Sequence, residues 1–333
     1  MQISDKLYGT FKIHEPVLAE LIDCHAVQRL KGIQQYGLPP EYSNNGNFTR
    51  YDHSLGVLLL LRKLGASLTE QVAGLLHDIS HTAFSHLTNA ILGTSLYTDL
   101  QDQRHEAFLL SSEAAPILRK HGYDPRHIAD LKRHTLLESE LPELCADRID
   151  YTLRELLHHE RPIDLEECVE RLAVHKDRII FTEMEMAAKF ATDYLYVMAE
   201  GWASIEKTVR QHFFIHAVQT ALDKDIISVD DLFEDDAHVL DKITRTKNPT
   251  IRASLQLLTS GFRLEEDERE PQLSLPRDFQ YVDPKFRRGG RIYSLSKTSP
   301  GFAQMVDRQK DLHRKGVRVR FLNSTGLLRR IKC

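Results

Sequence analysis

The sequence has few cysteines and no long apolar run, and both absences exclude classes of protein. Only four cysteines occur in 333 residues, and none forms a C-x-x-C pair, so neither a disulfide framework nor a zinc knuckle is expected. The longest apolar stretch, VLLLL from Val57, is far shorter than the roughly 20 residues that cross a bilayer. The N-terminus MQISDKLYG lacks the charged-then-apolar pattern of a signal peptide. We therefore expect reduced thiols, no membrane interaction and a cytoplasmic location.

Several common catalytic motifs are also missing. The chain contains no P-loop, no G-x-G-x-x-G, no G-x-S-x-G and no H-E-x-x-H. These absences argue against a P-loop NTPase, a dinucleotide-binding enzyme, an α/β-hydrolase and a zinc protease.

The composition is that of a folded globular chain, but its charge is unevenly distributed. Hydrophobic residues make up 41% and charged residues 28%, which suits one large core or two unequal ones. Residues 284–333 carry 14 Lys and Arg against two Asp and Glu, a net +12, so the first 283 residues carry −16 of the overall −4. Such a basic tail could attract phosphates, nucleic acid or an acidic partner, or could pair with the acidic body or a neighbouring subunit.

The first 170 residues predict successive helices. SLTEQVAGLLHDI (67–79) opens with Ser67 and Glu70 in capping-box spacing and gathers its apolar residues on one face. This pattern places His77 and Asp78 in the last turn. The run from His53 is apolar nearly all round, as in a helix buried on several sides, and LPELCADRIDYTLRELLHH predicts a third helix.

The later residues combine helices with short strands. Residues 171–182 predict a β-hairpin and 183–222 a helical stretch, while EEDEREPQLSLP reads as an exposed loop. After it, RIYSLS and VRVRFL predict strands on either side of a helix over 300–315. The fold class is therefore mainly α, with a small α+β region at the C-terminus.

Ionisable side chains interrupt the apolar helices. The set is His53, His77, Asp78 and Asp147, with His81, His86, His105 and Glu106 close by in sequence. Imidazole nitrogens and carboxylate oxygens together suit a divalent ion with open positions for water or phosphate. A single histidine on a helix is more often a hydrogen-bonded core residue, but the joint occurrence on three helices favours one common ion.

Three motifs carry a resemblance to a known family. RYDHSLGV, LLHDISHTAFSH and ADRIDY together resemble the HD-domain phosphohydrolases, whose signature is a His, a His-Asp pair and a distant Asp. More narrowly they resemble the deoxynucleotide triphosphohydrolase branch, which includes the sterile-alpha-motif HD protein of animals. The similarity covers residues 9–162 and is faint beyond residue 183. Together with the helix, strand and charge patterns above, it divides the chain into an HD catalytic core over 1–170, a helical continuation with a short hairpin over 171–260, and a basic α+β region over 271–333.

The resemblance also implies roles for individual residues. It implies one divalent metal ion (Fe, Mn, Co, Ni, Zn or Mg) held by His53, His77, Asp78 and Asp147. It implies catalytic roles for His81, His105 and Glu106. It implies substrate contacts from Arg50, His86, Arg148, Tyr151 and Glu155. It implies a partly kept allosteric nucleotide site at Asp23, Gln28, Lys31 and Gln35.

One departure from the family concerns the triphosphate. Relatives carry a Tyr-x-His-Lys pattern on a later helix, whereas YLYVMAEGWASIEKTVR here offers only Lys207 and Arg210. The expected function is hydrolysis of a nucleotide phosphate ester or anhydride, which includes conversion of a deoxynucleoside triphosphate to deoxynucleoside and triphosphate. The alternative is a nucleotide-sensing or nucleic-acid-binding HD protein with weak or incidental hydrolysis, for which the basic C-terminal region speaks. Relatives commonly form multimers, so a homo-oligomer is expected.

Overall fold

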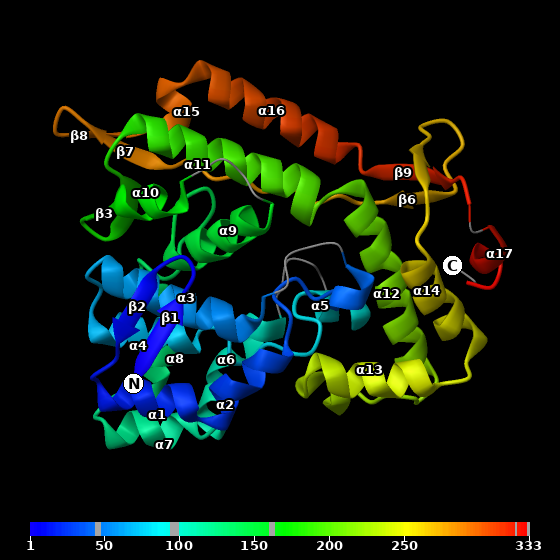
Figure 1. Cartoon of the computed structure of the whole chain (residues 1–333), viewed down its shortest axis with the longest axis horizontal. Coiled ribbons are helices and arrows are strands. Elements are labelled where there is room, and N and C mark those ends of the chain that lie inside the picture. Colours follow the sequence, from blue (N-terminus) through cyan, green and yellow to red (C-terminus); the bar gives the residue numbers. More distant parts are fainter. Residues whose placement is uncertain (44–47, 94–99, 160–163, 324, 332–333) are drawn as a thin grey trace.

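The computed structural model describes residues 1–43, 48–93, 100–159, 164–323 and 325–331, and Figure 1 shows their arrangement. Helices dominate this part of the chain, with short strands at the N-terminus and in the C-terminal half. The predicted fold class, mainly α with a small α+β C-terminal region, is confirmed. Three cysteines, Cys24, Cys145 and Cys168, are buried free thiols, and Cys333 lies outside the described residues.

The N-terminal half contains nine α-helices in its described residues, including the three predicted from sequence. They are α1 (Pro16–Asp23), α2 (His25–Gln28), α3 (Arg50–Lys63), α4 (Leu68–Leu76), α5 (Leu87–Ile91), α6 (Leu100–Ser111), α7 (Ala114–Lys120), α8 (Pro125–Ala129) and α9 (Ala146–His158). Helix α3 packs against both α4 and α9, and its Val57 and Leu58 are 0% exposed. The helix that the apolar run predicts is therefore buried on several sides.

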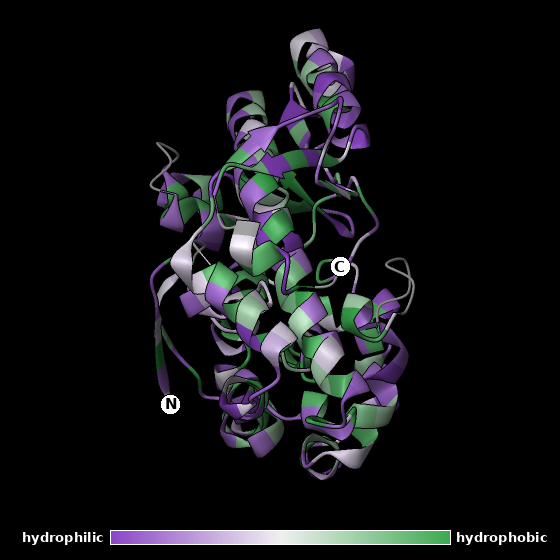
Figure 2. Ribbon diagram, turned by 90° about the vertical axis from the view of Figure 1, so that its right-hand side faces the viewer, coloured by the Kyte–Doolittle hydropathy of each residue, from purple (hydrophilic) through white to green (hydrophobic). Residues whose placement is uncertain are grey.

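The second half adds further helices, some of which join the same core as α3, α4 and α9. Its helices are α10 (Leu165–Glu170), α11 (Met184–Tyr196), α12 (Ile205–Asp223), α13 (Asp236–Arg245), α14 (Pro249–Ser260), α15 (Leu295–Thr298), α16 (Pro300–Arg314) and α17 (Thr325–Leu328). Helix α12 packs on α14 and on α5, and these elements contribute to a second apolar cluster beside the one that contains α3, α4 and α9. Green and purple residues alternate along many of the helices in Figure 2, as expected for amphipathic helices.

Three small sheets accompany the helices. Their strands are β1 (Gln2–Asp5), β2 (Gly9–Lys12), β3 (Leu172–His175), β4 (Arg178–Phe181), β5 (Leu264–Glu266), β6 (Leu273–Leu275), β7 (Lys285–Arg288), β8 (Arg291–Ser294) and β9 (Val317–Phe321). The predicted hairpin forms as β3 and β4, and β7 and β8 extend it into a sheet of order β3-β4-β7-β8. Strands from two of the regions expected from sequence therefore share one sheet.

The C-terminal strands lie where the sequence predicts them but pair with unexpected partners. RIYSLS supplies β8, VRVRFL supplies β9, and α16 lies between them, above α11 in Figure 1. Strand β9 is the centre of the sheet β5-β9-β6. EEDEREPQLSLP is therefore not a plain loop, because its two ends form strand residues of β5 and β6 that pair with β9. Within the described ranges, each helix is too short or too polar to cross a membrane.

Candidate metal centre

The start of α3 fixes the first predicted ligand. Thr49 and Asp52 form a capping box, in which Asp52 N donates to Thr49 Oγ1 at 3.2 Å and Thr49 N donates to Asp52 Oδ2 at 2.9 Å. This cap sets the beginning of the helix, so that Arg50 lies in the first turn and His53 one turn further on. The His53 ring is 0% exposed.

Helix α4 presents the second ligand at its C-terminus. Ser67 caps the helix as predicted, but the helix ends at Leu76, so His77 is its C-cap and Asp78 follows in a turn. The sequence pattern places His77 and Asp78 inside the last turn of this helix, whereas the helix ends one residue before His77. His77 Nδ1 lies 2.7 Å from the Gly74 carbonyl, and such local side-chain bonds compete with continuation of a helix.

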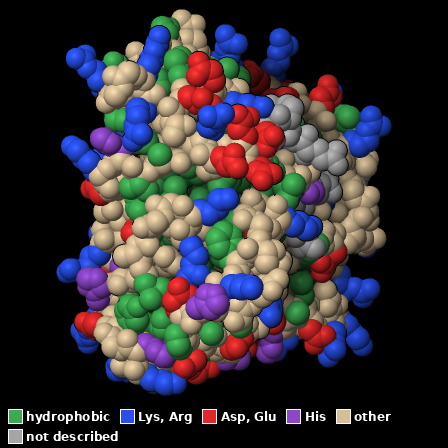
Figure 3. Space-filling view, turned by 60° about the vertical axis from the view of Figure 1, so that its left-hand side comes forward, with side chains coloured by type: hydrophobic (Ala, Val, Ile, Leu, Met, Phe, Trp, Pro, Cys, Tyr) green, Lys and Arg blue, Asp and Glu red, His purple; other side chains and the backbone are tan. Residues whose placement is uncertain are grey.

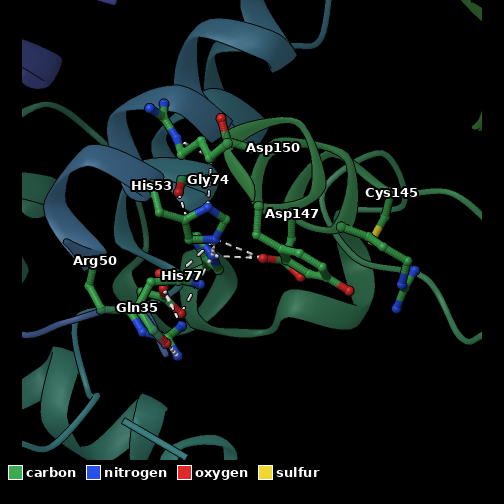
Figure 4. A network of polar contacts seen from close by, with 12 residues as sticks. Gln35, Arg50, His53, Gly74, His77, Cys145, Asp147 and Asp150 are labelled. Carbon is green, nitrogen blue, oxygen red and sulfur yellow. Dashed lines mark hydrogen bonds and ion pairs between the residues drawn. The ribbon is translucent and has the colours of Figure 1, made fainter. Parts of the chain in front are cut away.

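Side-chain atoms from three helical segments converge on one point (Figure 4). His53 Nε2 lies 2.8 Å from Asp147 Oδ1, and His77 Nε2 lies 3.2 Å from His53 Nε2 and 3.5 Å from Asp147 Oδ1. Asp78 adjoins them, with Oδ1 3.5 Å from His77 Nε2 and Oδ2 3.9 Å from His53 Nε2. The structure thus brings together all four residues that the resemblance implies as ligands.

The opposite nitrogen of each imidazole tests whether a metal ion fits. His53 Nδ1–H donates to Asp150 Oδ2 at 2.7 Å, and His77 Nδ1–H donates to the Gly74 carbonyl at 2.7 Å. Each neutral ring then keeps a lone pair on Nε2, as is usual for metal-binding histidines. Two such lone pairs repel at 3.2 Å unless a proton or a cation lies between them. The donor set of two imidazoles and carboxylates therefore fits one divalent ion, and His53, His77 and Asp147 form the core of that site.

The electrostatics of the cluster favour a cation. Burial opposes ionisation of Asp147, but hydrogen bonds from His53 and His77 outweigh it and hold the pKa of Asp147 well below its usual range. Burial likewise opposes protonation of His77, yet the carboxylates of Asp78 and Asp147 raise the pKa of His77 to about 9. A divalent ion that enters the cluster therefore replaces a proton.

Asp150 is a functional residue that the sequence reasoning missed. Its side chain is 0% exposed, and Oδ2 accepts from both His53 Nδ1 and Arg154 Nε, at 2.7 and 2.8 Å. Arg154 also donates to Asp5 at 2.8 Å, which anchors this acceptor to the N-terminal strand. The available signal was a second aspartate three residues after Asp147, on the same face of a helix.

Arg50, expected at a substrate phosphate, is 2% exposed and bonded within the protein. Its Nη1 donates to Asp78 Oδ2 at 2.7 Å and its Nη2 to the Gln35 carbonyl at 3.1 Å, while Nε donates to Ser85 Oγ at 3.1 Å. These bonds place the guanidinium beside the cluster through Asp78. Burial raises the cost of ionising Asp78, but Arg50 and the nearby histidines outweigh it and lower the pKa of Asp78.

Two more predicted histidines lie near this guanidinium. His81 Nε2 is 3.2 Å from Asp78 Oδ1, and the His81 and His86 rings meet edge to face with centroids 5.0 Å apart. Burial and then the Arg50 charge lower the pKa of His81 to about 3, so this ring is neutral at physiological pH. His86 is exposed.

The structure does not bring Glu106 to His105, the two residues expected to act as a pair. Both lie on α6, and consecutive residues of a helix do not face each other. The Glu106 side chain is 56% exposed and 3.8 Å from Arg126. His105 is buried with Nδ1 3.2 Å from Ser80 Oγ, and its Nε2 has no hydrogen-bond partner among the described residues. Burial and then the His77 charge lower the pKa of His105 to about 4.

The three residues of α9 that the resemblance implies as substrate contacts differ in their surroundings. Arg148 donates to the carbonyls of Ser139 and Glu143 at 3.2 and 2.7 Å, which commits it to backbone contacts. The Tyr151 ring lies 6.4 Å from the His53 ring, and Glu155 is 0% exposed. Tyr151 and Glu155 therefore face the interior beside the cluster, whereas Arg148 secures the preceding loop.

Trp202 belongs with Tyr151 and Glu155. Its ring lies 5.2 Å from Tyr151 and 6.3 Å from Tyr36. Its Nε1 and Glu155 Oε2 are both buried without a partner in the described part of the chain. The Lys207 ammonium lies 4.5 Å over the Tyr36 ring. Aromatic faces and unpaired polar atoms thus collect next to the cluster.

The four residues expected at an allosteric site are not all neighbours. Gln28 Oε1 accepts from Lys31 Nζ at 2.6 Å, Lys31 lies 4.6 Å over the Tyr51 ring, and Asp23 is exposed on the adjoining α1. Gln35 is instead 5% exposed and contacts Arg50 through its carbonyl. Gln35 therefore belongs to the candidate metal centre by position.

Glu138 was also missed. Ligand atoms of Glu138, Cys145 and Asp147 all lie within 4.8 Å of one another. Burial and then the Asp147 charge raise the pKa of Glu138 to about 8. No sequence signal pointed to it, because it lies in a polar connection before α9.

The fold and these contacts define a helical protein with a buried histidine and aspartate metal site between three helical segments. The pattern of the HD domain matches residues 50–241, which include His53, His77, Asp78 and Asp147. The chain belongs to the HD-domain family.

Known relatives agree with this membership. The chain is 34% identical over 326 residues to the uncharacterized protein YdhJ of Bacillus subtilis, covering 97% of this chain and 99% of that one. It is 40% identical over 156 residues to the metal-dependent phosphohydrolase cns2 of Cordyceps militaris, covering 46% of this chain and 44% of cns2. It is 34% identical over 100 residues to the bovine deoxynucleoside triphosphate triphosphohydrolase SAMHD1, covering 26% of this chain and 17% of SAMHD1.

A solved structure shares the whole fold. A phosphohydrolase of Bacteroides thetaiotaomicron superposes with a TM-score of 0.72 at 16% identity, over 96% of this chain and 98% of that one. At this identity the likeness shows the fold, and it extends from the HD core through the C-terminal strands.

Proposed function

We propose that this HD-domain protein is a metal-dependent phosphohydrolase that cleaves a phosphate ester or anhydride of a nucleotide. The observation that carries the proposal is the convergence of His53 Nε2, His77 Nε2 and Asp147 Oδ1 with both Nδ1 nitrogens held by acceptors. A divalent ion bound there supplies Lewis-acid activation of a phosphoryl oxygen and of the attacking water. The name of cns2 supports the same reaction class.

The residues of the chain itself orient the substrate and handle its charge. Asp150 fixes the tautomer of His53, and Arg50 carries a positive charge into the centre beside Asp78. His81 is neutral and its one N–H points at Asp78 Oδ1, so it orients this carboxylate without adding charge. The unengaged Nε2 of His105 is the atom we assign to proton transfer.

The side chain of Asp147 indicates the direction of access. It is 19% exposed, whereas the His53 side chain is 0% and that of Asp78 is 5% exposed. A phosphate group therefore reaches the cluster past Asp147.

We assign the organic end of the substrate to Tyr151, Glu155 and Trp202. Tyr151 links this group to the metal cluster, because its ring is 6.4 Å from His53 and 5.2 Å from Trp202. Flat aromatic faces suit a base, and a buried carboxylate with a free oxygen suits a sugar hydroxyl. The activity named for bovine SAMHD1 makes a deoxynucleoside triphosphate the first substrate to test.

The alternative of nucleic-acid binding depends on free positive charge at the C-terminus. Several of those basic residues are paired with acids, including Lys285 with Glu143 and Arg320 with Glu265. On the face shown in Figure 3, blue and red side chains lie close together instead of forming one basic field. Hydrolysis is the better supported function, because it rests on the converging donor set. Homo-oligomeric assembly and a cytoplasmic location stay predictions.

The deciding experiment is a product screen. Protein loaded with Mn, Fe or Co is incubated with nucleoside mono-, di- and triphosphates, and the released orthophosphate, pyrophosphate or triphosphate is identified. We expect metal-dependent release of one of these from at least one nucleotide. A fully loaded protein that releases none of them would overturn the proposal. A salt titration of RNA and DNA binding, expected to show no affinity at physiological salt, tests the alternative.

A further inference from the structure

The loop between α4 and α5, residues 77–86, is held by a segment from the second half of the chain. This segment runs from Leu232 to Asp236 and joins η5 (Asp230–Phe233) to α13. Asp236 is 5% exposed, and its carboxylate accepts two backbone hydrogen bonds, from Phe84 N to Oδ1 at 2.7 Å and from Gln34 N to Oδ2 at 2.9 Å. One side chain thus ties together two chain segments that are 50 residues apart in sequence.

Both tied residues adjoin the partners of Arg50. Phe84 precedes Ser85, whose Oγ accepts from Arg50 Nε at 3.1 Å, and Gln34 precedes Gln35, whose carbonyl accepts from Arg50 Nη2 at 3.1 Å. Ser85 Oγ also donates to the Gln34 carbonyl at 2.6 Å. Two of the three bonds that Arg50 donates therefore end on residues that directly follow the two residues held by Asp236.

The loop needs such a support. Phe84 and Ser85 have φ angles of 62° and 47°, a left-handed conformation that side chains other than glycine adopt at a cost. Strained backbone of this kind persists only where its surroundings fix it. The bond from Phe84 N to Asp236 falls on the first of these residues, and a bond from Ala83 N to the Leu232 carbonyl at 2.8 Å holds the residue before it.

A second side chain ties the same two regions together. Arg29 Nη2 donates to the carbonyls of Ile79 and His81 at 2.9 and 2.6 Å, and its Nη1 donates to those of Phe233 and Glu234 at 3.3 and 3.1 Å. The loop is therefore held to the Leu232–Asp236 segment at two places. Arg29 holds residues 79–81, and Asp236 holds Phe84.

We propose that Asp236 and Arg29 are positioning residues that hold Arg50 in the orientation in which it meets a substrate phosphate. The inference rests on the proposed function, since it takes Arg50 as the phosphate contact. It assigns to the segment before α13 a role in substrate affinity, although no residue of that segment contacts the metal cluster.

The test measures two affinities of the Asp236→Asn variant, one for inorganic phosphate and one for Mn, and compares each with that of the wild-type protein. The amide keeps one acceptor but turns an NH₂ group toward the other backbone N–H, so one of the two ties breaks. We expect Mn-loaded protein to bind inorganic phosphate about tenfold more weakly in isothermal titration calorimetry, while the affinity for Mn itself stays unchanged. Measurement at pH 8 keeps the carboxylate of the wild-type protein ionised, because burial raises the pKa of Asp236 to about 7.

Two further variants keep the test decisive. Arg29→Lys loses the forked contact with the loop but keeps the charge, and it should show the same selective weakening of phosphate binding, even where Asp236→Asn fails to fold. Asp231→Asn is the matched control, since Asp231 lies in η5 immediately before the segment but bonds to Ser228, His238 and Lys242. It should change neither affinity.

Three results would overturn the inference. They are an unchanged phosphate affinity in both positioning variants, an equal loss of Mn and phosphate affinity, or the same loss in Asp231→Asn. Turnover of nucleotides by the wild-type protein tests the proposed function separately. Absent turnover with a selective loss of phosphate binding would reject the function and leave the role of Asp236 standing.

Discussion

Gly56 of α3 lies directly against Asp150 of α9. A β-carbon on Gly56 would fall 2.0 Å from Asp150 Oδ1 and 2.0 Å from Arg154 Nη2. Glycine inside a helix costs roughly 0.5–1 kcal/mol relative to alanine, so its presence here has a packing reason. The missing side chain lets the two helices approach closely enough for Asp150 to reach His53 Nδ1.

Gly56→Ala should therefore damage both stability and metal binding. We expect a loss of about 1–3 kcal/mol in the free energy of unfolding, as for an overpacked core, together with weaker metal affinity because Asp150 is displaced from His53. Denaturant unfolding and metal titration measure the two effects. Gly301→Ala is the control, because nothing lies within 4 Å of a β-carbon there. A metal affinity equal to that of the wild-type protein would contradict the role given to Gly56.

Asp150→Asn isolates the hydrogen bond to His53 without changing the size of the side chain. An amide is a weaker acceptor than a carboxylate and can also present its NH₂ group, so His53 is less firmly held in the Nδ1–H tautomer. We expect metal affinity to fall about 10–100-fold, the usual effect of losing such an outer partner. Asp130→Asn, which alters an exposed carboxylate bonded to Arg133, should bind metal normally. Equal affinities in the two variants would remove Asp150 from the centre.

The parts of the fold that the sequence predicts well depend on local signals. A capping residue locates the start of α4, an apolar run identifies α3, and apolar periodicity identifies α9. Because a cap and a periodic face act within one helix, they survive whatever the helix later packs against. The same local signals place the four predicted ligands, since each lies at a fixed position on one of these helices or at its end.

The parts that escaped prediction depend on contacts between distant segments. Asp236 lies 152 residues from Phe84, which it holds, and β5 and β6 become strands through pairing with β9. Glu106 shows a different limit: it is next to His105 in sequence, yet its side chain is 56% exposed while His105 is buried. Adjacency in sequence does not give the direction of a side chain, which the helical period sets.

Asp147→Ala tests whether metal binding and catalysis share one site. This carboxylate contacts both histidines, so its removal takes away a ligand and the charge that balances the ion. We expect metal retention and nucleotide turnover to be lost together, as measured by metal analysis after desalting and by the product screen. Glu106→Gln, at an exposed carboxylate on α6, should keep its metal. Stoichiometric metal with full turnover in Asp147→Ala would refute the assignment of this centre.

The last prediction concerns the dependence of stability on pH. Burial lowers the pKa of His105 to about 4, against about 6.5 for an unperturbed histidine. Between these values the unfolded chain binds a proton on His105 that the folded chain does not, so the contribution of His105 to stability is present above pH 6.5 and falls as the pH drops toward 4. The loss amounts to at most about 1.4 kcal/mol per pH unit.

His105→Gln removes this proton uptake from the unfolded state, so its stability should decline less steeply with acid than that of the wild-type protein. Urea unfolding of the metal-free proteins between pH 7 and 5 gives the two slopes, and all other titrating groups cancel in the difference. His25→Gln serves as the control, because the His25 side chain is 77% exposed and its replacement should leave the wild-type slope. Parallel slopes for His105→Gln and wild type would mean that His105 takes up a proton in the folded protein as readily as in the unfolded chain, so its burial would have no effect on its protonation.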